Sequence, residues 1–430
     1  MLYLEYPADE TKIRKRFIFT ETRQPEIDRS VERIIGSVKK RGDKALLEFT
    51  KRFDGVNLSP TRLRVSPPEL REAWRGLTPK LRGIVKLAAK RIEKFHAPQK
   101  QTGYETREPG GSVLAYRISP LSSVGLYVPG GTAAYPSSLL MNAVPAKLAG
   151  VREITMVTPP GSKGKVHPFI LGTAYYLGLR KVYRVGGAQA VAALAFGTKI
   201  IPRVDKVVGP GNAYVAAAKR SLYGIIDIDM IAGPSEILVI ADTTAKIPNI
   251  VADLLSQAEH DPLAVCVLIY IGRLDKKTFQ RELRRQVERS PRREIIRNSL
   301  KSQGMVVTVK TRSQAVELAN LKAPEHLEVL ARNPDKLAPK LTNAGAIFVG
   351  PYTPEPIGDY VAGPNHVLPT GGTARFFSPL SVSSFTKATS ILKLTPKDFS
   401  KLANPAIQFA EEEGLPAHAN AVRLRLESKS

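Results

Sequence analysis

The stretch Ser256–Ile271 reads SQAEHDPLAVCVLIYI and joins a polar cluster to an apolar run. A helical pattern leads into the cluster from Ile247, and Leu263–Ile271 predicts a buried strand. Gln257 and His260 are three residues apart, so a helix here would place both side chains on one face. Most such pairs are surface features. A helix, a polar cluster and a buried strand in this order nevertheless predict chemistry at a sheet edge of an α/β protein.

Short β-branched runs alternate with Ala- and Leu-rich runs along most of the chain, which is the pattern of βαβ units and a parallel sheet. The predicted strands are Val113–Ile118, Val124–Val128, Glu153–Thr158, Lys181–Val185, Lys206–Val208, Ile225–Met230, Glu236–Ala241, Val265–Ile271, Met305–Val309 and Ala346–Val349. The predicted helices are Glu26–Arg41, Asp43–Phe53, Pro67–Phe95 (interrupted), Ser137–Leu148, His167–Leu177, Ala188–Phe196, Ala213–Leu222, Pro396–Glu413 and Leu415–Leu426. We therefore predict an α/β fold with two Rossmann-like, doubly wound parallel-sheet domains and small N- and C-terminal helical extensions.

Two segments do not follow this alternation. Residues 1–25 have mixed charge and a short β-like run at Phe17–Thr20, and they are expected to form an arm. Pro and Gly cluster in Gly350–Pro379, which predicts an irregular loop that is too long to be without a function in a compact domain.

The composition is that of a soluble globular protein, with 430 residues, 43% hydrophobic and 24% charged. No apolar run approaches the roughly 18 residues that a membrane span needs, and the charged first twenty residues do not resemble a signal peptide. A cytoplasmic location is expected, with no membrane partner. The single cysteine, Cys266, lies inside the apolar run and is expected to be a buried, inert thiol.

The net charge of +25 is the unusual bulk feature. It raises the alternative of a nucleic-acid-binding protein, which would bind DNA or RNA with a steep salt dependence. The basic residues are spread along the chain, however, without aromatic interleaving or zinc-finger spacing. A solvated basic surface, without a nucleic-acid partner, is the better interpretation.

The histidines indicate a single site. Only six are present, and four of them lie in short segments dense in Gly, Pro, Asn and acidic residues: His260, His326, His366 and His418. Imidazole, carboxylate and amide groups without cysteine suit zinc, with manganese as second choice. Such a mixed ligand shell could come from Gln257, His260, Asp359 and His418, although an amide oxygen is an uncommon zinc ligand. Because no His-Glu-x-x-His motif occurs, a zinc-protease interpretation has no support.

Glu325 and His326 follow Pro324, which we interpret as the start of a helix. A carboxylate and an imidazole at one site would offer two proton acceptors near neutral pH, as a reaction with two deprotonations requires. The alternative is a solvated pair at an ordinary helix start.

Several glycine turns lie between predicted elements, at Pro129–Thr132, Val185–Ala190, Val208–Ala213 and Ala232–Glu236. Glycine lets backbone N–H groups approach phosphates at helix N-termini. None of these turns matches G-x-G-x-x-G, so the standard Rossmann fingerprint is missing. Each turn alone is weak evidence, but together they predict a nucleotide crevice of a non-standard type.

In combination, these segments resemble the histidinol dehydrogenase family. The resemblance is carried, in the family's order, by Val124–Gly131, Val185–Ala190, Gly209–Asn212, Ala232–Glu236, Gln257–Pro262, Pro324–Glu328, Gly358–His366 and Leu415–His418. It implies a four-electron, NAD-dependent alcohol and aldehyde dehydrogenase of histidine biosynthesis. That enzyme oxidises L-histidinol to L-histidine through a bound aldehyde with two NAD⁺.

The resemblance also implies residue roles. Zinc would be held by Gln257, His260, Asp359 and His418, and would bind the substrate as well. His326 would take the alcohol proton, and Glu325 would activate water for attack on the aldehyde. Further substrate contacts would come from Ser235, His366 and Glu413, and NAD contacts from Tyr127, Gln189 and Asn212. The enzyme would be a homodimer in which the C-terminal tail, with Glu413 and His418, completes the partner's site.

The same resemblance suggests a division of the chain. Residues 1–25 are expected to form the arm, residues 26–123 and 236–378 a first α/β domain with most of the metal and catalytic site, and residues 124–235 an NAD-binding α/β domain. Residues 379–430 are expected to be the dimerisation tail. The alternative function is a metal-dependent hydrolase of the α/β class, in which the metal activates water directly.

Overall fold

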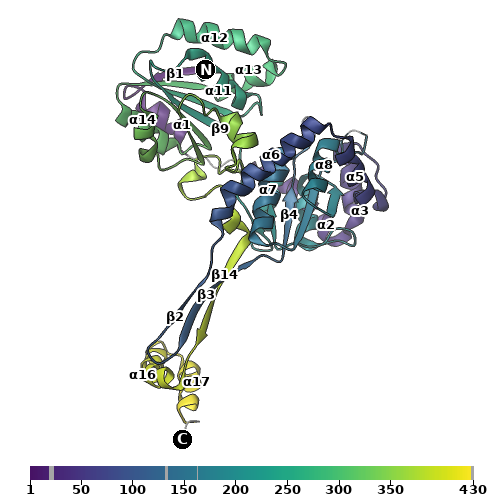
Figure 1. The fold of residues 1–430 in the computed structure, drawn as a ribbon, viewed down its shortest axis with the longest axis vertical. Coiled ribbons are helices and arrows are strands. Elements are labelled where there is room, and N and C mark those ends of the chain that lie inside the picture. The colour runs from purple at the N-terminus through teal and green to yellow at the C-terminus, as the bar shows by residue number, and fades with distance from the viewer. Residues whose placement is uncertain (19–23, 131–133, 162, 428–430) are drawn as a thin grey trace. The chain divides into compact units, whose positions relative to one another are not determined.

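The computed structural model describes residues 1–18, 24–130, 134–161 and 163–427. The chain forms two compact units (Figure 1). The first consists of residues 1–99 and 121–385, and the second of residues 100–120 and 386–430. None of the helices in the described part is long and apolar enough to cross a membrane.

A parallel six-stranded sheet forms one half of the first unit (Figure 1). Its order is β1 (Leu2–Glu5), β11 (Met305–Val309), β10 (Val265–Ile271), β9 (Glu236–Ala241), β12 (His326–Leu330) and β13 (Ala346–Val349). The helices of this half are α1 (Glu10–Phe17), α11 (Ile247–Ala258), α12 (Lys276–Arg289), α13 (Arg293–Ser302) and α14 (Arg312–Lys322). Side chains of β9 and β10 enter two separate apolar cores, one on each face of the sheet. Burial on both faces explains why these strands read as continuous apolar runs.

A parallel five-stranded sheet forms the other half of the first unit. Its order is β6 (Lys181–Arg184), β5 (Glu153–Thr158), β4 (Ser123–Tyr127), β7 (Lys206–Val208) and β8 (Asp227–Ile228). The helices between these strands are α7 (Pro136–Ala149), α8 (Pro168–Tyr176), α9 (Gly187–Phe196) and α10 (Ala213–Leu222). The prediction of two doubly wound parallel-sheet domains is thus confirmed.

The N-terminal quarter belongs to both halves. Residues 2–5 are not part of an arm: they form β1, which pairs in parallel with β11 at the sheet edge. Of the β-like run Phe17–Thr20, Phe17 is the last residue of α1, and Phe19 and Thr20 lie outside the described residues. The following helices are α2 (Pro25–Arg41), α3 (Asp43–Asp54), α4 (Pro60–Leu63), α5 (Pro67–Gly76) and α6 (Pro79–His96).

These N-terminal helices pack against the five-stranded half. Helix α2 contacts α9 and α10, α5 contacts α8, and α6 contacts α7. Their apolar side chains, such as Ile34 and Ile92, are part of the cores on that sheet. The expected grouping of residues 26–123 with residues 236–378 therefore does not describe these contacts, because the apolar faces of the helices are covered by the helices of the other sheet.

The second unit contains an antiparallel three-stranded sheet, which the sequence did not predict. It consists of β14 (Thr386–Lys393), β3 (Val113–Pro120) and β2 (Tyr104–Arg107), followed by α16 (Pro396–Glu412) and α17 (Pro416–Glu427). The predicted strand Val113–Ile118 exists, but it pairs with β14 and β2 in antiparallel registers rather than opening a βαβ unit. Local β propensity does not specify the partner.

Two other local predictions need correction. Residues 326–330 form β12, a buried strand between β9 and β13, and not the first turn of a helix. Gly350–Pro379 is mostly irregular, but it contains the short helix α15 (Glu355–Ile357) and a π-helical turn at Gly358–Ala362. Cys266 is fully buried in β10, and its burial raises the pKa of the thiol to about 12, as expected for an inert cysteine.

Candidate functional site

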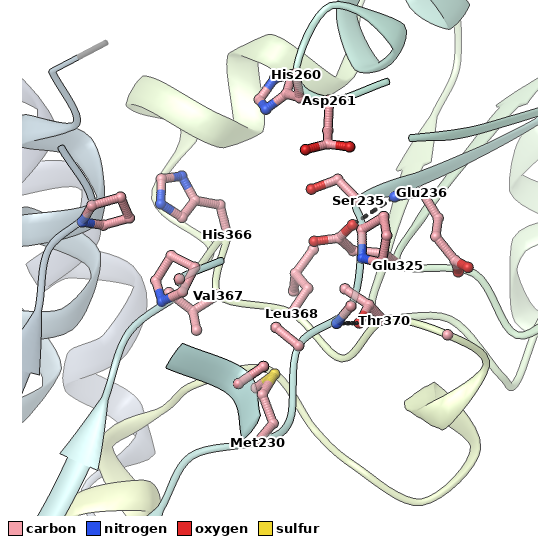
Figure 2. Close-up of a pocket in the computed structure, with 18 of the residues that line it drawn as sticks. Met230, Ser235, Glu236, His260, Asp261, Glu325, His366, Val367, Leu368 and Thr370 are labelled. Carbon is pink, nitrogen blue, oxygen red and sulfur yellow. Dashed lines mark hydrogen bonds between the residues drawn. The ribbon is translucent and has the colours of Figure 1, made fainter. Parts of the chain in front are cut away.

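A cavity of about 1520 Å³ lies in the first unit (Figure 2). Nine of the twelve predicted site residues line it: Tyr127, Asn212, Ser235, Gln257, His260, Glu325, His326, Asp359 and His366. Gln189 is buried in α9 and is not among the lining residues. Glu413 and His418 belong to the second unit, where both are exposed.

The two sheets present opposite ends of their strands to this cavity. Ser235 and Glu325 immediately precede β9 and β12, so the six-stranded sheet contributes the amino ends of its strands. Tyr127 ends β4 and Gly209 follows β7, so the five-stranded sheet contributes carboxyl ends. Only the second arrangement follows the usual rule for open α/β sheets.

The backbone of Glu236 holds both members of the predicted acid/base pair. Its N–H donates to Glu325 Oε2 at 2.8 Å, and its carbonyl oxygen lies 3.0 Å from His326 Nδ1. Because a carbonyl only accepts, Nδ1 of His326 carries the proton, and the lone pair of the neutral ring is on Nε2. That Nε2 atom is buried and has no hydrogen-bond partner among the described residues.

Burial shifts the pKa values of this pair in opposite directions. It lowers the pKa of His326 to about 3, with the hydrogen bond to Glu236 opposing the shift, so the imidazole is neutral at physiological pH. Burial also raises the pKa of Glu325 well above its ordinary value, and nearby acidic groups, Glu236 first, add to the shift. Glu325 is therefore a stronger base than a solvated glutamate when it is ionised.

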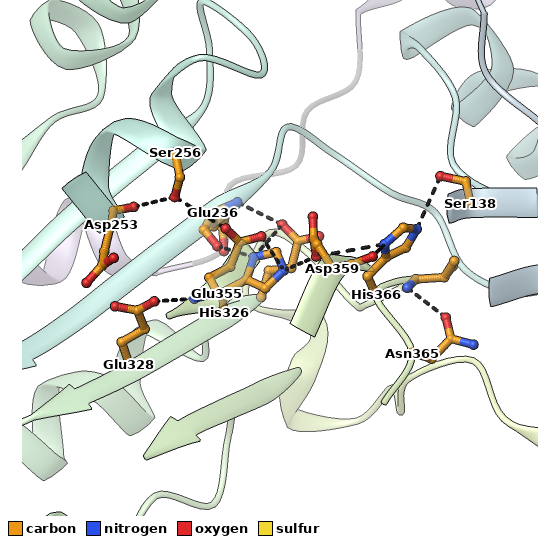
Figure 3. A network of polar contacts seen from close by, with 12 residues as sticks. Ser138, Glu236, Asp253, Ser256, His326, Glu328, Glu355, Asp359, Asn365 and His366 are labelled. Carbon is orange, nitrogen blue, oxygen red and sulfur yellow. Dashed lines mark hydrogen bonds and ion pairs between the residues drawn. The ribbon is translucent and has the colours of Figure 1, made fainter. Parts of the chain in front are cut away.

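Two further ionisable side chains, Glu355 and Asp359, meet His326 of this pair (Figure 3). One ligand atom from each of His326, Glu355 and Asp359 lies within 4.8 Å of the others, close enough to hold a metal ion. Nε2 of His326 is 3.9 Å from both Glu355 Oε1 and Asp359 Oδ1. Sequence reasoning missed Glu355, which follows Pro354 in the long loop and carried no recognisable motif signal.

One of the donors proposed for zinc, Gln257, has a buried oxygen that a cation would satisfy. Gln257 Oε1 is buried without a hydrogen-bond partner in the described part of the chain, although buried amide oxygens are normally satisfied. His260 and Asp359 line the same cavity. Metal binding at Nε2 of His326 would instead occupy the lone pair that a general base needs, so we favour the set that contains Gln257 and His260.

The helical pairing expected for Gln257 and His260 is wrong in its detail. Helix α11 ends at Ala258, and His260 lies in the turn that follows, where its N–H donates to the carbonyl of Gln257 at 3.1 Å. The Asp261–Pro262 sequence after it favours this termination. Both side chains reach the cavity nevertheless.

His366 connects the long loop to helix α7 (Figure 3). Its Nδ1 donates to the carbonyl of Asp359 at 2.9 Å, which leaves Nε2 to accept from the Ser138 hydroxyl at 3.2 Å. Burial lowers the pKa of His366 to about 4, so the ring is neutral and keeps this pair of bonds. Asn365 Nδ2 donates to the carbonyl of Met141 in the same helix. The segment that contains Asp359 is thereby anchored at its end.

The glycine turns of the five-stranded half are held close to Tyr127. Gly187 starts α9 and donates its N–H to Tyr127 Oη at 3.0 Å. At Gly209, φ is 114° and a Cβ would lie 2.1 Å from the carbonyl oxygen of Tyr127, so only glycine fits. Asn212 caps α10 by accepting the N–H groups of Tyr214 and Val215. Gly131 and Thr132 of the turn Pro129–Thr132 lie outside the described residues.

Comparison with known proteins gives a consistent result. Residues 19–426 match the family model "Histidinol dehydrogenase". The chain is 50% identical to the histidinol dehydrogenase of Clostridium acetobutylicum over 93% of this chain and 92% of that protein. It is 49% identical to that of Heliobacterium mobile over 92% and 93%, respectively. The crystal structure of histidinol dehydrogenase from Elizabethkingia anophelis superposes with a TM-score of 0.92 at 36% identity, covering 100% of this chain and 98% of that one.

Proposed function

Because the chain belongs to the histidinol dehydrogenase family, an NAD-dependent oxidoreductase family of histidine biosynthesis, we propose that its cavity oxidises L-histidinol to L-histidine with two NAD⁺. The observation that carries the proposal is the pair of proton acceptors, Glu325 and His326, held on the backbone of Glu236 at the cavity. The family does not support the alternative of a metal-dependent hydrolase.

The first oxidation removes a hydride from the alcohol carbon and a proton from its hydroxyl group. We assign the proton to His326 Nε2, whose lone pair is buried at the cavity with no competing partner in the described residues. The low pKa of the ring means that the base form is present throughout the neutral range. NAD⁺ accepts the hydride, and the products are the aldehyde, NADH and one proton.

The second oxidation requires water. Addition of water to the aldehyde gives a gem-diol, which then transfers a hydride to the second NAD⁺ and loses two protons to become a carboxylate. We assign water activation to Glu325, because its burial makes the carboxylate a stronger base than in solvent. The two residues thus divide the deprotonations between them.

We propose zinc as the metal, with manganese as second choice, held by Gln257, His260 and Asp359 together with His418. The partnerless buried oxygen of Gln257 supports a cation here. When bound, zinc would act as a template that fixes the imidazole and the amine of histidinol. Ser235, His366 and Glu413 are proposed as further substrate contacts.

We propose that NAD lies against the glycine turns of the five-stranded half. Tyr127 and Asn212 line the cavity there, and the exposed N-terminal turn of α10 suits an anionic group. Gln189 is fully buried, and its Oε1 has no partner within the described chain. We therefore retain it as an NAD contact that would require a local opening, such as rotation of its side chain.

The test of the reaction is NADH formation from purified protein, L-histidinol and NAD⁺. We expect two NADH per histidinol, loss of activity on treatment with a strong chelator, and recovery with zinc. A folded, zinc-loaded protein that forms no NADH would reject the proposal. Recovery with manganese but not with zinc would reject the metal assignment alone.

We further propose a cytoplasmic homodimer in which Glu413 and His418 complete the partner's site. The two variants Glu325→Gln and His418→Ala should each be nearly inactive. After mixing and subunit exchange, half of the dimers contain both variants, and one of their two sites is intact, so activity should recover to about a quarter of the wild-type value. Absence of recovery despite proven exchange would contradict a shared site.

A further inference from the structure

A buried ion pair contacts the acid/base residues through the backbone of one of its members, Glu236. Lys322 Nζ donates to Glu236 Oε1 at 2.6 Å, and the two side chains are only 7% and 6% exposed. Glu236 is the residue whose N–H holds Glu325 (Figure 2) and whose carbonyl holds His326 (Figure 3). One residue thus makes three polar contacts, two through its backbone and one through its charge.

Resting on the proposed function, we infer that the Glu236–Lys322 ion pair positions Glu325 and His326 for both oxidation steps. Neither residue is assigned a chemical step. A buried ion pair contributes little net stability relative to apolar side chains, because the desolvation of two charges offsets their attraction. Its function here is to keep the Glu236 backbone in place.

The chain path between Lys322 and Glu325 makes such a restraint necessary. Lys322 is the last residue of α14, and Ala323 follows in the left-handed region at φ 49° and ψ 61°. This conformation is strained for a residue with a Cβ, and it persists only where the surroundings enforce it. Pro324 and Glu325 then lead directly into β12. The ion pair fixes the start of this tight connection.

The far side of the connection is fixed by backbone bonds. Gly345 and Ala346 donate their N–H groups to the carbonyls of Pro324 and Glu325, both at 2.9 Å. A Cβ at Gly345 would lie 2.6 Å from the carbonyl oxygen of Glu325, so β13 approaches as closely as the backbone permits. The backbone bonds to β13 hold Glu325 from one side only. If the strained backbone at Ala323 relaxed, Glu325 could still move from the side of Lys322, and the ion pair with Glu236 is the polar contact that prevents this movement.

The carboxylate of Glu236 depends on Lys322 for its charge compensation. Glu236 Oε2 is buried and has no hydrogen-bond partner among the residues described, so Lys322 is the principal compensation for this carboxylate. Removal of Lys322 would leave a buried charge uncompensated beside Glu325. Glu236 would then rotate or draw in water, and its backbone would move with it.

The experiment compares Lys322→Met, Glu236→Gln and the double variant with the wild type. We expect Lys322→Met to lower kcat for histidinol and for the aldehyde supplied directly, each by about 10- to 100-fold, with KM for histidinol changed less than about threefold. The double variant should recover part of the loss, because a neutral Gln needs no countercharge. Arg41→Met, which removes an exposed cation from the Arg41–Glu48 pair, is the matched control and should leave kcat unchanged.

A second readout does not depend on turnover. Nitrogen NMR of the histidine side chains, with His326 assigned by difference from His326→Asn, should show a single Nδ1–H tautomer in the wild type. Lys322→Met should populate both tautomers. Should the wild type form no NADH, the proposed function fails, and the tautomer measurement still decides this inference.

A folded Lys322→Met variant with wild-type kcat and one tautomer would overturn the inference. So would a loss of kcat that only follows the loss of folded protein. If Lys322→Met does not fold, Glu236→Gln decides in its place, since it keeps the size of the side chain but removes the charge that pairs with Lys322, so kcat should fall and both tautomers should appear. Wild-type kcat and an unchanged tautomer in that variant would overturn the inference as well.

Discussion

Two buried lysine–carboxylate pairs, one in each half of the first unit, can be compared directly. Lys322 pairs with Glu236 in the six-stranded half, and Lys219 pairs with Asp229 in the five-stranded half. Each lysine lies in the last turn of a helix, α14 or α10, where the helix dipole favours a cation. All four side chains are less than 10% exposed.

The two ion pairs restrain different parts of the backbone. The first pair fixes the residue whose backbone binds Glu325 and His326. The second holds a glycine turn: Asp229 Oδ2 accepts the N–H of Gly209 at 2.7 Å, and Lys219 Nζ donates to its carbonyl at 3.1 Å. The same kind of ion pair thus supports the residues proposed for catalysis at the amino ends of one sheet and the glycine turn proposed to bind NAD at the carboxyl ends of the other. Variants in the two halves should therefore change different kinetic constants.

The largest effect is expected from the acid/base pair itself. Glu325→Gln removes the base proposed for water activation, so oxidation of the aldehyde should slow by about 100- to 10,000-fold, and that of the alcohol much less. His326→Ala should slow the alcohol step first. Single-turnover rates with histidinol and with the aldehyde measure the two steps separately. Equal slowing of both steps by Glu325→Gln would contradict the division of labour.

An intermediate effect is expected in the five-stranded half. Lys219→Met leaves Asp229 buried without its cation and frees the carbonyl of Gly209, so the glycine turn should loosen. We expect KM for NAD⁺ to rise about tenfold, the equivalent of one charge-assisted hydrogen bond. Steady-state kinetics with varied NAD⁺ measure this change. A fall in kcat with an unchanged KM for NAD⁺ would mean that Lys219 affects the same kinetic constant as Lys322. It would contradict the expected difference between the two halves.

A further prediction concerns the pH dependence of stability rather than turnover, through Glu328. Burial raises the pKa of this β12 residue to about 9, and its Oε1 accepts the N–H of Glu355 at 2.6 Å. Between its ordinary pKa of 4.5 and about 9, the folded protein keeps a proton that the unfolded chain releases. Stability contributed by this group is therefore lost as pH rises through that window.

Glu328→Gln cannot ionise, so its free energy of unfolding should decrease less steeply with rising pH, by about 1.4 kcal/mol for each pKa unit removed. Urea unfolding across the window measures the slopes. Asp54→Asn in the five-stranded half is the comparison, because burial raises the pKa of Asp54 only to about 6 and restricts its effect to lower pH. If the free energy of unfolding changed equally steeply with pH in the wild type and in Glu328→Gln, Glu328 would not be a buried neutral acid in the folded protein.

The strands that could be predicted are those whose buried side chains are mostly apolar, and the strand that was missed contains buried polar side chains. Strands β5, β7, β9, β10, β11 and β13 have the predicted bounds, since their apolar periodicity reflects burial directly. Strand β12 was missed because His326 and Glu328 are polar yet buried, at 4% and 0% exposed. A pattern of polar and apolar residues assigns such side chains to the surface. Only their tertiary partners make their burial tolerable.

The candidate site shows the same limit. Motif order and residue type were sufficient to name Glu325, His326 and the proposed ligands, because scarce histidines in polar segments are a local signal. The roles of Glu236, Lys322 and Glu355 had no such signal. Glu236 appeared only as the junction between a glycine turn and a predicted strand, and Lys322 as one of many basic residues.

By itself, the sequence determined the family, the reaction class, most strand bounds and the residues proposed for catalysis, because each depends on short stretches of chain. The tertiary structure alone decided that β3 joins an antiparallel sheet and that helices α2 to α6 pack on the five-stranded half. It also decided that Glu236 holds both residues proposed for catalysis. Strand pairing and ion pairs between residues about 90 positions apart depend on which surfaces meet in the folded chain, and no local pattern of residue types contains that information.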